Sequence, residues 1–118
     1  IKHKEKVMKL FTKAHEATLR KNYEANLEAE GGIDFKPVVK LFTANAGATW
    51  LLTELSPDGV FFGLCDLGHG FPELGYVPLN ELESLPKEFL LERDQWFTAT
   101  KTIGEYAREA RNNQMIVA

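Results

Sequence analysis

Residues 60–85 read V-F-F-G-L-C-D-L-G-H-G-F-P-E-L-G-Y-V-P-L-N-E-L-E-S-L, and this stretch is the most informative part of the chain for the fold. It opens with strand-forming residues over 60–66, and a glycine-rich loop follows at 67–70. A further strand is expected over 71–77, where Pro72 indicates an edge strand or a bulge. Two adjacent strands joined by a short loop predict an antiparallel pair.

A short helix is expected directly after these strands. Asn80 is a favourable N-cap residue, and Glu83 stands three residues later, as in a capping box. Pro86 would end the helix. Residues 88–97 are ambiguous, with extended structure expected near Leu90 and again near Trp96.

Two more strands precede the stretch. Residues 38–43 and 48–55 are rich in strand formers, and the turn-forming residues 44–47 separate them. Ser-Pro-Asp-Gly at 56–59 is a strong β-turn signal that leads into the strand at 60–66. Short turns between consecutive strands predict an antiparallel meander.

Both faces of the central strands carry large apolar side chains. Strict alternation would place Trp50, Leu52 and Glu54 on one face and Leu51, Thr53 and Leu55 on the other. Either helices cover both faces of the sheet, or one face binds a partner.

Helices flank the sheet in the sequence. Thr12 is a plausible N-cap for a helix over 13–22 or beyond. Thr102 and Glu105 form a second capping-box pattern, and the helix that follows has one apolar face made of Ile103, Tyr106, Ala107 and Ala110. The tail after Asn113 is expected to be loosely held. The predicted fold is therefore α+β: a small antiparallel meander of three to five strands, an N-terminal helix, a short helix after the fourth strand and a C-terminal helix.

Length and charge limit the possible functions. The chain has 118 residues, one cysteine and a net charge of −3. Residues 1–7 look like translated upstream sequence or a cloning remnant, which leaves 8–118 as a single domain. They carry three lysines and one glutamate, so without this +2 the charge is −5. An acidic domain argues against electrostatic capture of nucleic acid or of an anionic membrane. No apolar run reaches the ~20 residues of a membrane span, and no signal peptide is evident, so we expect a cytoplasmic protein.

The ordered set of motifs resembles an uncharacterised bacterial family, the domain of unknown function 2958. The residues that carry the resemblance are K-P-V-V-K-L-F-T at 36–43, Thr49-Trp50 with Glu54, F-F-G-L at 61–64, E-L-G-Y at 73–76, Leu79, Glu81-Leu82 and the opening M-K-L-F-T-K at 8–13. The resemblance covers residues 8–97, whereas residues 24–34 and the helix from Thr102 look less typical. It implies a protein encoded on plasmids, phages or integrated mobile elements, with no established activity, cofactor or catalytic residue.

A metal site is one chemical hypothesis. Asp66, His69 and Glu73 lie within eight residues, and Glu54 could approach them from the neighbouring strand. Carboxylate and imidazole ligands could hold a divalent metal that activates water, as in a hydrolase or nuclease. The competing interpretation is that Asp66 caps its loop, His69 is solvated and Glu73 pairs with a lysine. Cys65 could be a nucleophile with His69 as its base, although its strand position favours a buried, inert thiol.

Binding without catalysis is the favoured function. Aromatic residues recur on the neighbouring strands: Trp50, Phe61, Phe62, Phe71 and Tyr76. Such residues could stack single-stranded bases, but only Lys36 and Lys40 lie nearby, so core packing or a protein interface fits better. We therefore expect a non-enzymatic, protein-binding accessory factor without a cofactor. Its site would be lined by Trp50, Glu54, Asp66, His69, Glu73 and Tyr76; the metal-dependent enzyme is the alternative, and single-stranded nucleic-acid binding comes third.

Overall fold

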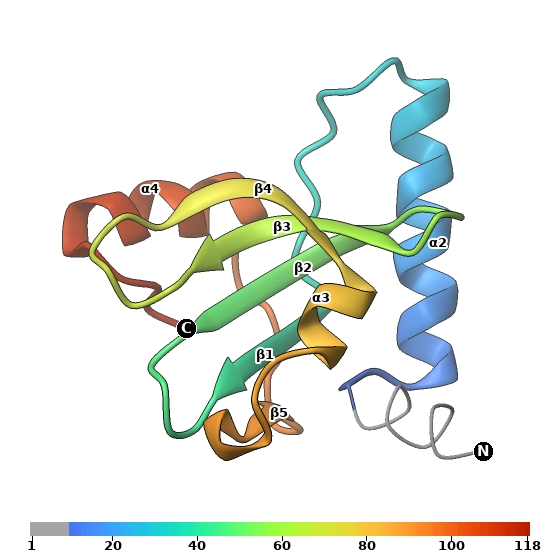
Figure 1. The fold of residues 1–118 in the computed structure, drawn as a ribbon. Helices are drawn as coiled ribbons and strands as arrows, with labels where there is room; N and C mark the ends of the chain where they lie inside the picture. Colours follow the sequence, from blue (N-terminus) through green and yellow to red (C-terminus); the bar gives the residue numbers. More distant parts are fainter. Residues whose placement is uncertain (1–9) are drawn as a thin grey trace.

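The computed structural model describes residues 10–118 and confirms the α+β class (Figure 1). The predicted extension at 1–7 lies outside these residues. The helices and strands are, in chain order, α2 (Lys13–Glu28), β1 (Val39–Thr43), β2 (Thr49–Leu55), β3 (Val60–Asp66), β4 (Glu73–Pro78), α3 (Leu79–Glu83), a 3₁₀ turn (Lys87–Phe89), β5 (Leu91–Arg93) and α4 (Ile103–Asn113).

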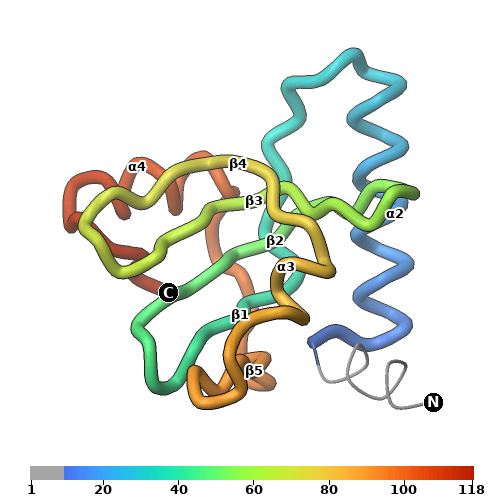
Figure 2. The backbone as a smooth tube through the Cα atoms, in the orientation of Figure 1, coloured from blue at the N-terminus to red at the C-terminus, as the bar shows by residue number. Residues whose placement is uncertain are grey.

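The strands form one five-stranded antiparallel sheet in the order β4-β3-β2-β1-β5. The first four strands follow one another through short turns, as predicted, and the backbone trace shows this meander directly (Figure 2). Pro72 immediately precedes β4, which is an edge strand. The chain returns to the opposite edge only at β5, where Thr43 is paired with Leu91.

One face of the sheet carries the larger core. Trp50 and Leu52 of β2 and Phe61 of β3 are buried here, together with Leu19 of α2 and Leu82 of α3. Helix α2 begins with a capping box in which the Thr12 hydroxyl accepts from the His15 N–H, and the His15 Nδ1 accepts from the Thr12 N–H at 3.1 Å. The predicted cap is therefore confirmed, with histidine in the position usually taken by Glu or Gln.

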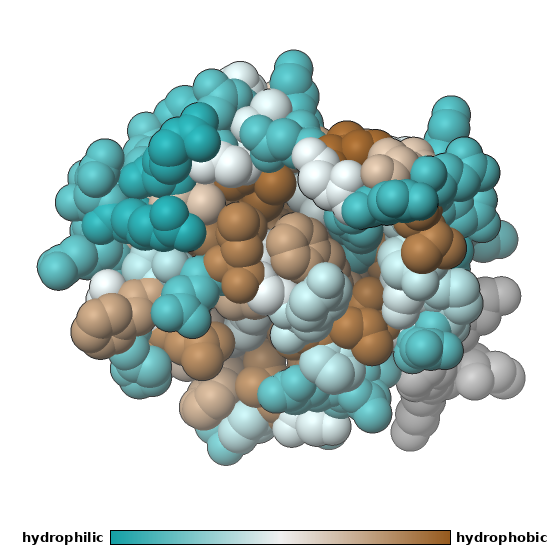
Figure 3. All heavy atoms as spheres, turned by 90° about the horizontal axis from the view of Figure 1, so that it is seen from above, coloured by the Kyte–Doolittle hydropathy of each residue, from teal (hydrophilic) through white to brown (hydrophobic). Residues whose placement is uncertain are grey.

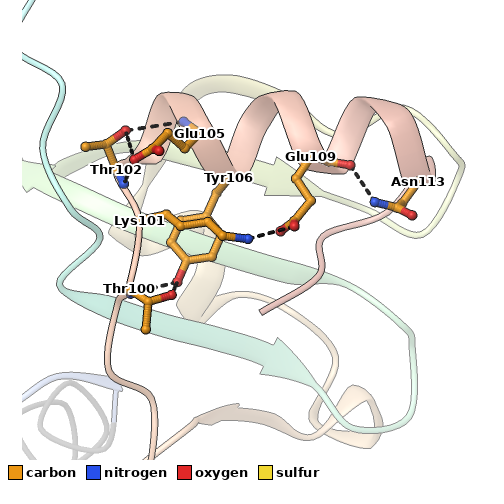
Figure 4. A network of polar contacts seen from close by, with 7 residues as sticks. All are labelled: Thr100, Lys101, Thr102, Glu105, Tyr106, Glu109 and Asn113. Carbon is orange, nitrogen blue, oxygen red and sulfur yellow. Dashed lines mark hydrogen bonds and ion pairs between the residues drawn. The ribbon is translucent and has the colours of Figure 1, made fainter.

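Helix α4 covers part of the other face, so helices pack on both sides of the sheet. Its buried side chains are those of the predicted apolar face, and they pack against Leu51 and Leu64. Local polar contacts stabilise the start of the helix (Figure 4): Thr102 and Glu105 form the predicted capping box, and Lys101 pairs with Glu109 at 2.7 Å. The hydrogen bond that Lys101 donates to the Glu109 carboxylate raises the pKa of Lys101.

A β-bulge changes the direction of the side chains in β2. Leu52 is paired with Gly63 and Glu54 with Phe62, so two residues advance along β2 for one along β3 and Thr53 is the extra residue. The strict alternation predicted for this strand is therefore wrong after Leu52. Glu54 lies on the face of Leu51 and α4, whereas Leu55 joins Trp50 and Leu52 in the larger core.

Two local predictions are corrected. Asn80 does not cap α3, because the helix starts at Leu79 after the extended residue Pro78 and has no side-chain cap. The tail after Asn113 is not loose. Ile116 is buried, and its N–H donates to the Asp66 carboxylate on β3.

Candidate functional site

A hollow of about 440 Å³ lies between the C-terminal half of α2 and the adjoining ends of β2, β3 and β4. We call it the α2–β3 hollow. Its volume falls in the range of about 300–1,000 Å³ that is typical of ligand pockets. Seen from above, apolar side chains gather between two hydrophilic margins on this side of the molecule (Figure 3). The lining residues are Tyr23, Asn26, Leu27, Glu30, Gly31, Glu54, Ser56, Asp58, Val60, Phe62 and Tyr76.

The helical wall of the hollow comes from one side of α2 and its end. Tyr23, Asn26 and Leu27 lie three and four residues apart, which places them on one helix face, and Glu30 follows beyond the end of the helix. None of these four residues was predicted to line a site, although the spacing of the three helical ones was an available signal. Glu30 lies just past the helix with φ of 59°, a left-handed conformation that favours glycine.

Polar contacts hold this half of α2 against the sheet. Leu19 is the one buried residue of α2, and it lies in the helix's first half. Further along, the Asn22 side-chain amide donates to the Thr53 carbonyl at 3.0 Å. The Asn26 Oδ1 accepts from the Ile33 N–H at 3.1 Å and so fixes the loop after the helix. Hydrogen bonds, rather than apolar packing, therefore position the wall of the hollow.

Glu54 lies on the floor of the hollow because the bulge directs it there. The residue is 7% exposed. Its carboxylate oxygens lie 3.4 and 3.5 Å from the Asn26 Nδ2, which is long for a hydrogen bond. No basic side chain of residues 10–118 forms an ion pair with it. Burial raises the pKa of Glu54, and the Asn26 amide offsets this only in part.

Aromatic rings form the sheet side of the hollow. Phe62 of β3 and Tyr76 of β4 are paired across the strands, with ring centroids 5.1 Å apart and planes inclined at 58°. Tyr76 is 76% exposed although it lies in a strand. The structure thus brings two of the predicted site residues, Glu54 and Tyr76, to one hollow.

Asp66 has a structural role at the other end of β3. It is 4% exposed, its Oδ1 accepts from the Gly68 N–H, and its Oδ2 accepts from the Ile116 N–H, both at 2.9 Å. The carboxylate therefore closes the predicted loop and fastens the C-terminal tail. Trp50, another predicted site residue, is buried in the larger core and lines no surface.

The residues of the metal hypothesis are not brought together. Glu54 is paired with Phe62, which precedes Asp66 by four strand residues, or roughly 13 Å. His69 and Glu73 are exposed, on the loop and at the start of β4. Within residues 10–118, no three His, Cys, Asp or Glu side chains are arranged to hold a metal ion. The geometry therefore gives the metal-dependent enzyme no ligand set among the described residues.

Cys65 is not an activated nucleophile. The thiol packs against the larger core, and burial, with a smaller contribution from Glu81, raises its pKa to about 11. A catalytic cysteine needs a lowered pKa and an adjacent base.

A second exposed aromatic residue was not foreseen. Trp96 is 91% exposed in a turn after β5, where extended structure was expected. It borders a shallow surface with Lys40, Phe42 and Arg93. This surface lies by the β1–β5 edge of the sheet, away from Tyr76 on β4.

Comparison with known proteins adds a family to this geometry. A family model described as a protein of unknown function (DUF2958) matches residues 10–117. The chain belongs to this family. The DUF2958 match includes residues 24–34 and α4, which the resemblance had set apart as less typical, so the wall of the hollow lies within the family domain. Comparison with curated proteins and with solved structures gave no match. None of the helices in residues 10–118 is long and apolar enough to cross a membrane.

Proposed function

We propose that this DUF2958 chain is a non-enzymatic protein-binding module, an accessory factor of mobile genetic elements, and that its partner docks at the α2–β3 hollow. The observation that carries the proposal is Tyr76. A tyrosine that is 76% exposed, on an edge strand and beside a hollow, has the character of an interface anchor.

The surroundings of Tyr76 support this proposal. Phe62 stacks obliquely against the Tyr76 ring, and Leu27, at 66% exposure, faces the same hollow from α2. A partner side chain placed in the hollow would therefore contact apolar surface on both the sheet side and the α2 side. The absence of an assembled ligand set among the described residues leaves no comparable observation in favour of the metal-dependent enzyme.

Site-specific photo-crosslinking tests the proposal. A photoreactive phenylalanine analogue replaces Tyr76 in one variant and Trp96 in a matched control, since both residues are exposed aromatics near opposite edges of the sheet. We expect a discrete protein adduct from position 76 in the native host. The adduct partner, identified by mass spectrometry and purified, should bind the unmodified chain and lose affinity with Tyr76→Ala. Adducts from position 96 alone, or no effect of Tyr76→Ala on affinity, would place docking elsewhere and refute the proposal.

A further inference from the structure

The α2–β3 hollow has an uneven charge. Three of its lining residues are acidic, namely Glu30, Glu54 and Asp58, and none is Lys, Arg or His. Arg20 contacts one lining residue, because its side chain donates to the Ser56 carbonyl at 3.1 Å. Its Nε is paired with Glu16 at 2.8 Å. Negative charge in the hollow is therefore not balanced by an ion pair from the described part of the chain.

The two buried carboxylates of the sheet differ in how they are satisfied. Asp66 accepts one short backbone hydrogen bond on each oxygen. Glu54 is almost as buried, yet both its oxygens share a single amide nitrogen at 3.4–3.5 Å. An ionised carboxylate can accept about four hydrogen bonds, and buried charges are ordinarily paired. The Glu54 carboxylate can therefore accept further hydrogen bonds from a donor that enters the α2–β3 hollow.

The aromatic walls favour a cation as that donor. Tyr23, Phe62 and Tyr76 all border the hollow. The face of an aromatic ring attracts an ammonium or guanidinium group, and the attraction grows when the group is desolvated. An apolar group placed in the hollow would instead bury Glu54 further without a partner, which is unfavourable.

We propose that the α2–β3 hollow receives one basic side chain, a lysine or arginine of the partner protein, whose cationic group pairs with Glu54 between the aromatic rings. This inference rests on the proposed function and names the chemistry that the partner presents there. The area outside the hollow then makes the remaining contacts with the partner. Recognition of the basic side chain fixes the register of docking.

Capped tripeptides provide a direct test. Acetyl-Gly-X-Gly-amide is titrated into the ¹⁵N-labelled chain with X as arginine, lysine, citrulline or norleucine, and amide shifts are followed by NMR. We expect saturable shifts for arginine and lysine, with Kd on the order of 1 mM for so small a ligand. The shifts should cluster at Asn26, Gly31 and Val60. Citrulline and norleucine, which match in shape but carry no charge, should bind at least tenfold more weakly.

Two charge-matched variants separate the site from general electrostatics. Glu54→Gln should weaken binding of the arginine peptide at least tenfold. It should leave the fold intact, because a buried carboxylate with a raised pKa is replaced by a neutral isostere. Glu92→Gln removes one negative charge at an exposed residue of β5, on the opposite edge of the sheet. Its Kd for the arginine peptide should stay within twofold of that of the unmodified chain.

The outcomes also separate this inference from the proposed function. Equal binding of the arginine and citrulline peptides, shifts that map away from the hollow, or no loss with Glu54→Gln would each overturn the inference. If those results accompany a partner crosslinked at position 76, the docking surface stands and only its basic ligand is refuted. Binding of the basic peptides without any partner at position 76 would uphold the pocket chemistry and refute protein docking there.

Discussion

Replacing Gly63 with alanine should disrupt the central strand pair. A Cβ atom at Gly63 would lie 2.0 Å from the Leu51 carbonyl oxygen and 2.9 Å from the Leu52 Cα, both backbone atoms of β2. Ordinary contact begins near 3.4 Å, so the strands must separate by about 1.4 Å, which is 3.4 minus 2.0. The bulge at Thr53 begins directly after the residues that this Cβ would meet, and neither backbone can yield as a flexible side chain would.

The magnitude follows from the hydrogen bonds that this separation would break. Lengthening a bond of ordinary length by 1.4 Å takes it well beyond hydrogen-bonding distance. Each buried backbone group left without its hydrogen bond costs ~1–3 kcal/mol, or about 2 kcal/mol at the middle of that range. Two affected groups therefore give about 4 kcal/mol. Domains of this size are stable by about 5–15 kcal/mol, so the variant should be barely folded.

Gly75 supplies the matched control. It is directly paired with Gly63 on the neighbouring strand β4, and a Cβ there would meet nothing within 4 Å. Gly75→Ala should leave stability unchanged or raise it by ~0.5 kcal/mol, because a strand glycine is entropically unfavourable. Urea unfolding followed by circular dichroism measures both variants. A Gly63→Ala protein within 1 kcal/mol of the unmodified chain would show that the close backbone contact at this position does not require a glycine.

Three further predictions concern individual side chains. Asp66→Asn should lower the free energy of unfolding by about 2 kcal/mol, because an amide cannot accept both backbone hydrogen bonds. The variant should also expose the Ile116 N–H to hydrogen exchange, and continued protection at Ile116 would contradict the role assigned to Asp66. Burial, with a smaller contribution from Arg93, lowers the pKa of His15 below 6.5, so the unfolded chain binds this proton more tightly. Its contribution to stability is therefore complete above pH 6.5 and declines as the pH falls below it. His15→Gln should reduce that decline, and identical pH profiles of thermal stability would refute the lowered pKa of His15. Cys65, with a pKa of about 11 against an ordinary 9.0, should react with iodoacetamide about 100-fold more slowly in the native than in the denatured protein, and equal rates would contradict its burial.

Local signals account for most of the fold. Each of these signals depends only on residues that are close together in the sequence. The structure confirms the Ser-Pro-Asp-Gly turn at 56–59, the capping residues Thr12 and Thr102 and the edge strand indicated by Pro72. Asn80 shows the limit of such signals. A capping pattern was present, but the extended Pro78 already starts the helix two residues earlier.

The site was less predictable because it depends on contacts between distant residues. The bulge at Thr53 places Glu54 beside Phe62 and Tyr76, and nothing in the sequence of β2 alone marks an extra residue there. Asp66 and Glu54 are both strand carboxylates in the sequence. Only their neighbours, the Ile116 N–H for one and an open hollow for the other, distinguish a structural group from a candidate binding group.

The return of the chain to β5 has a consequence for the order of folding. Phe42 and Thr49 are paired across seven residues, whereas Thr43 and Leu91 are paired across 48. Closing the longer loop costs about 2 kcal/mol more chain entropy than closing the hairpin. The three-residue strand β5 recovers little of this through its own pairing. The hairpins of the meander should therefore assemble first, and β5, with the Trp96 turn behind it, should dock last and open first.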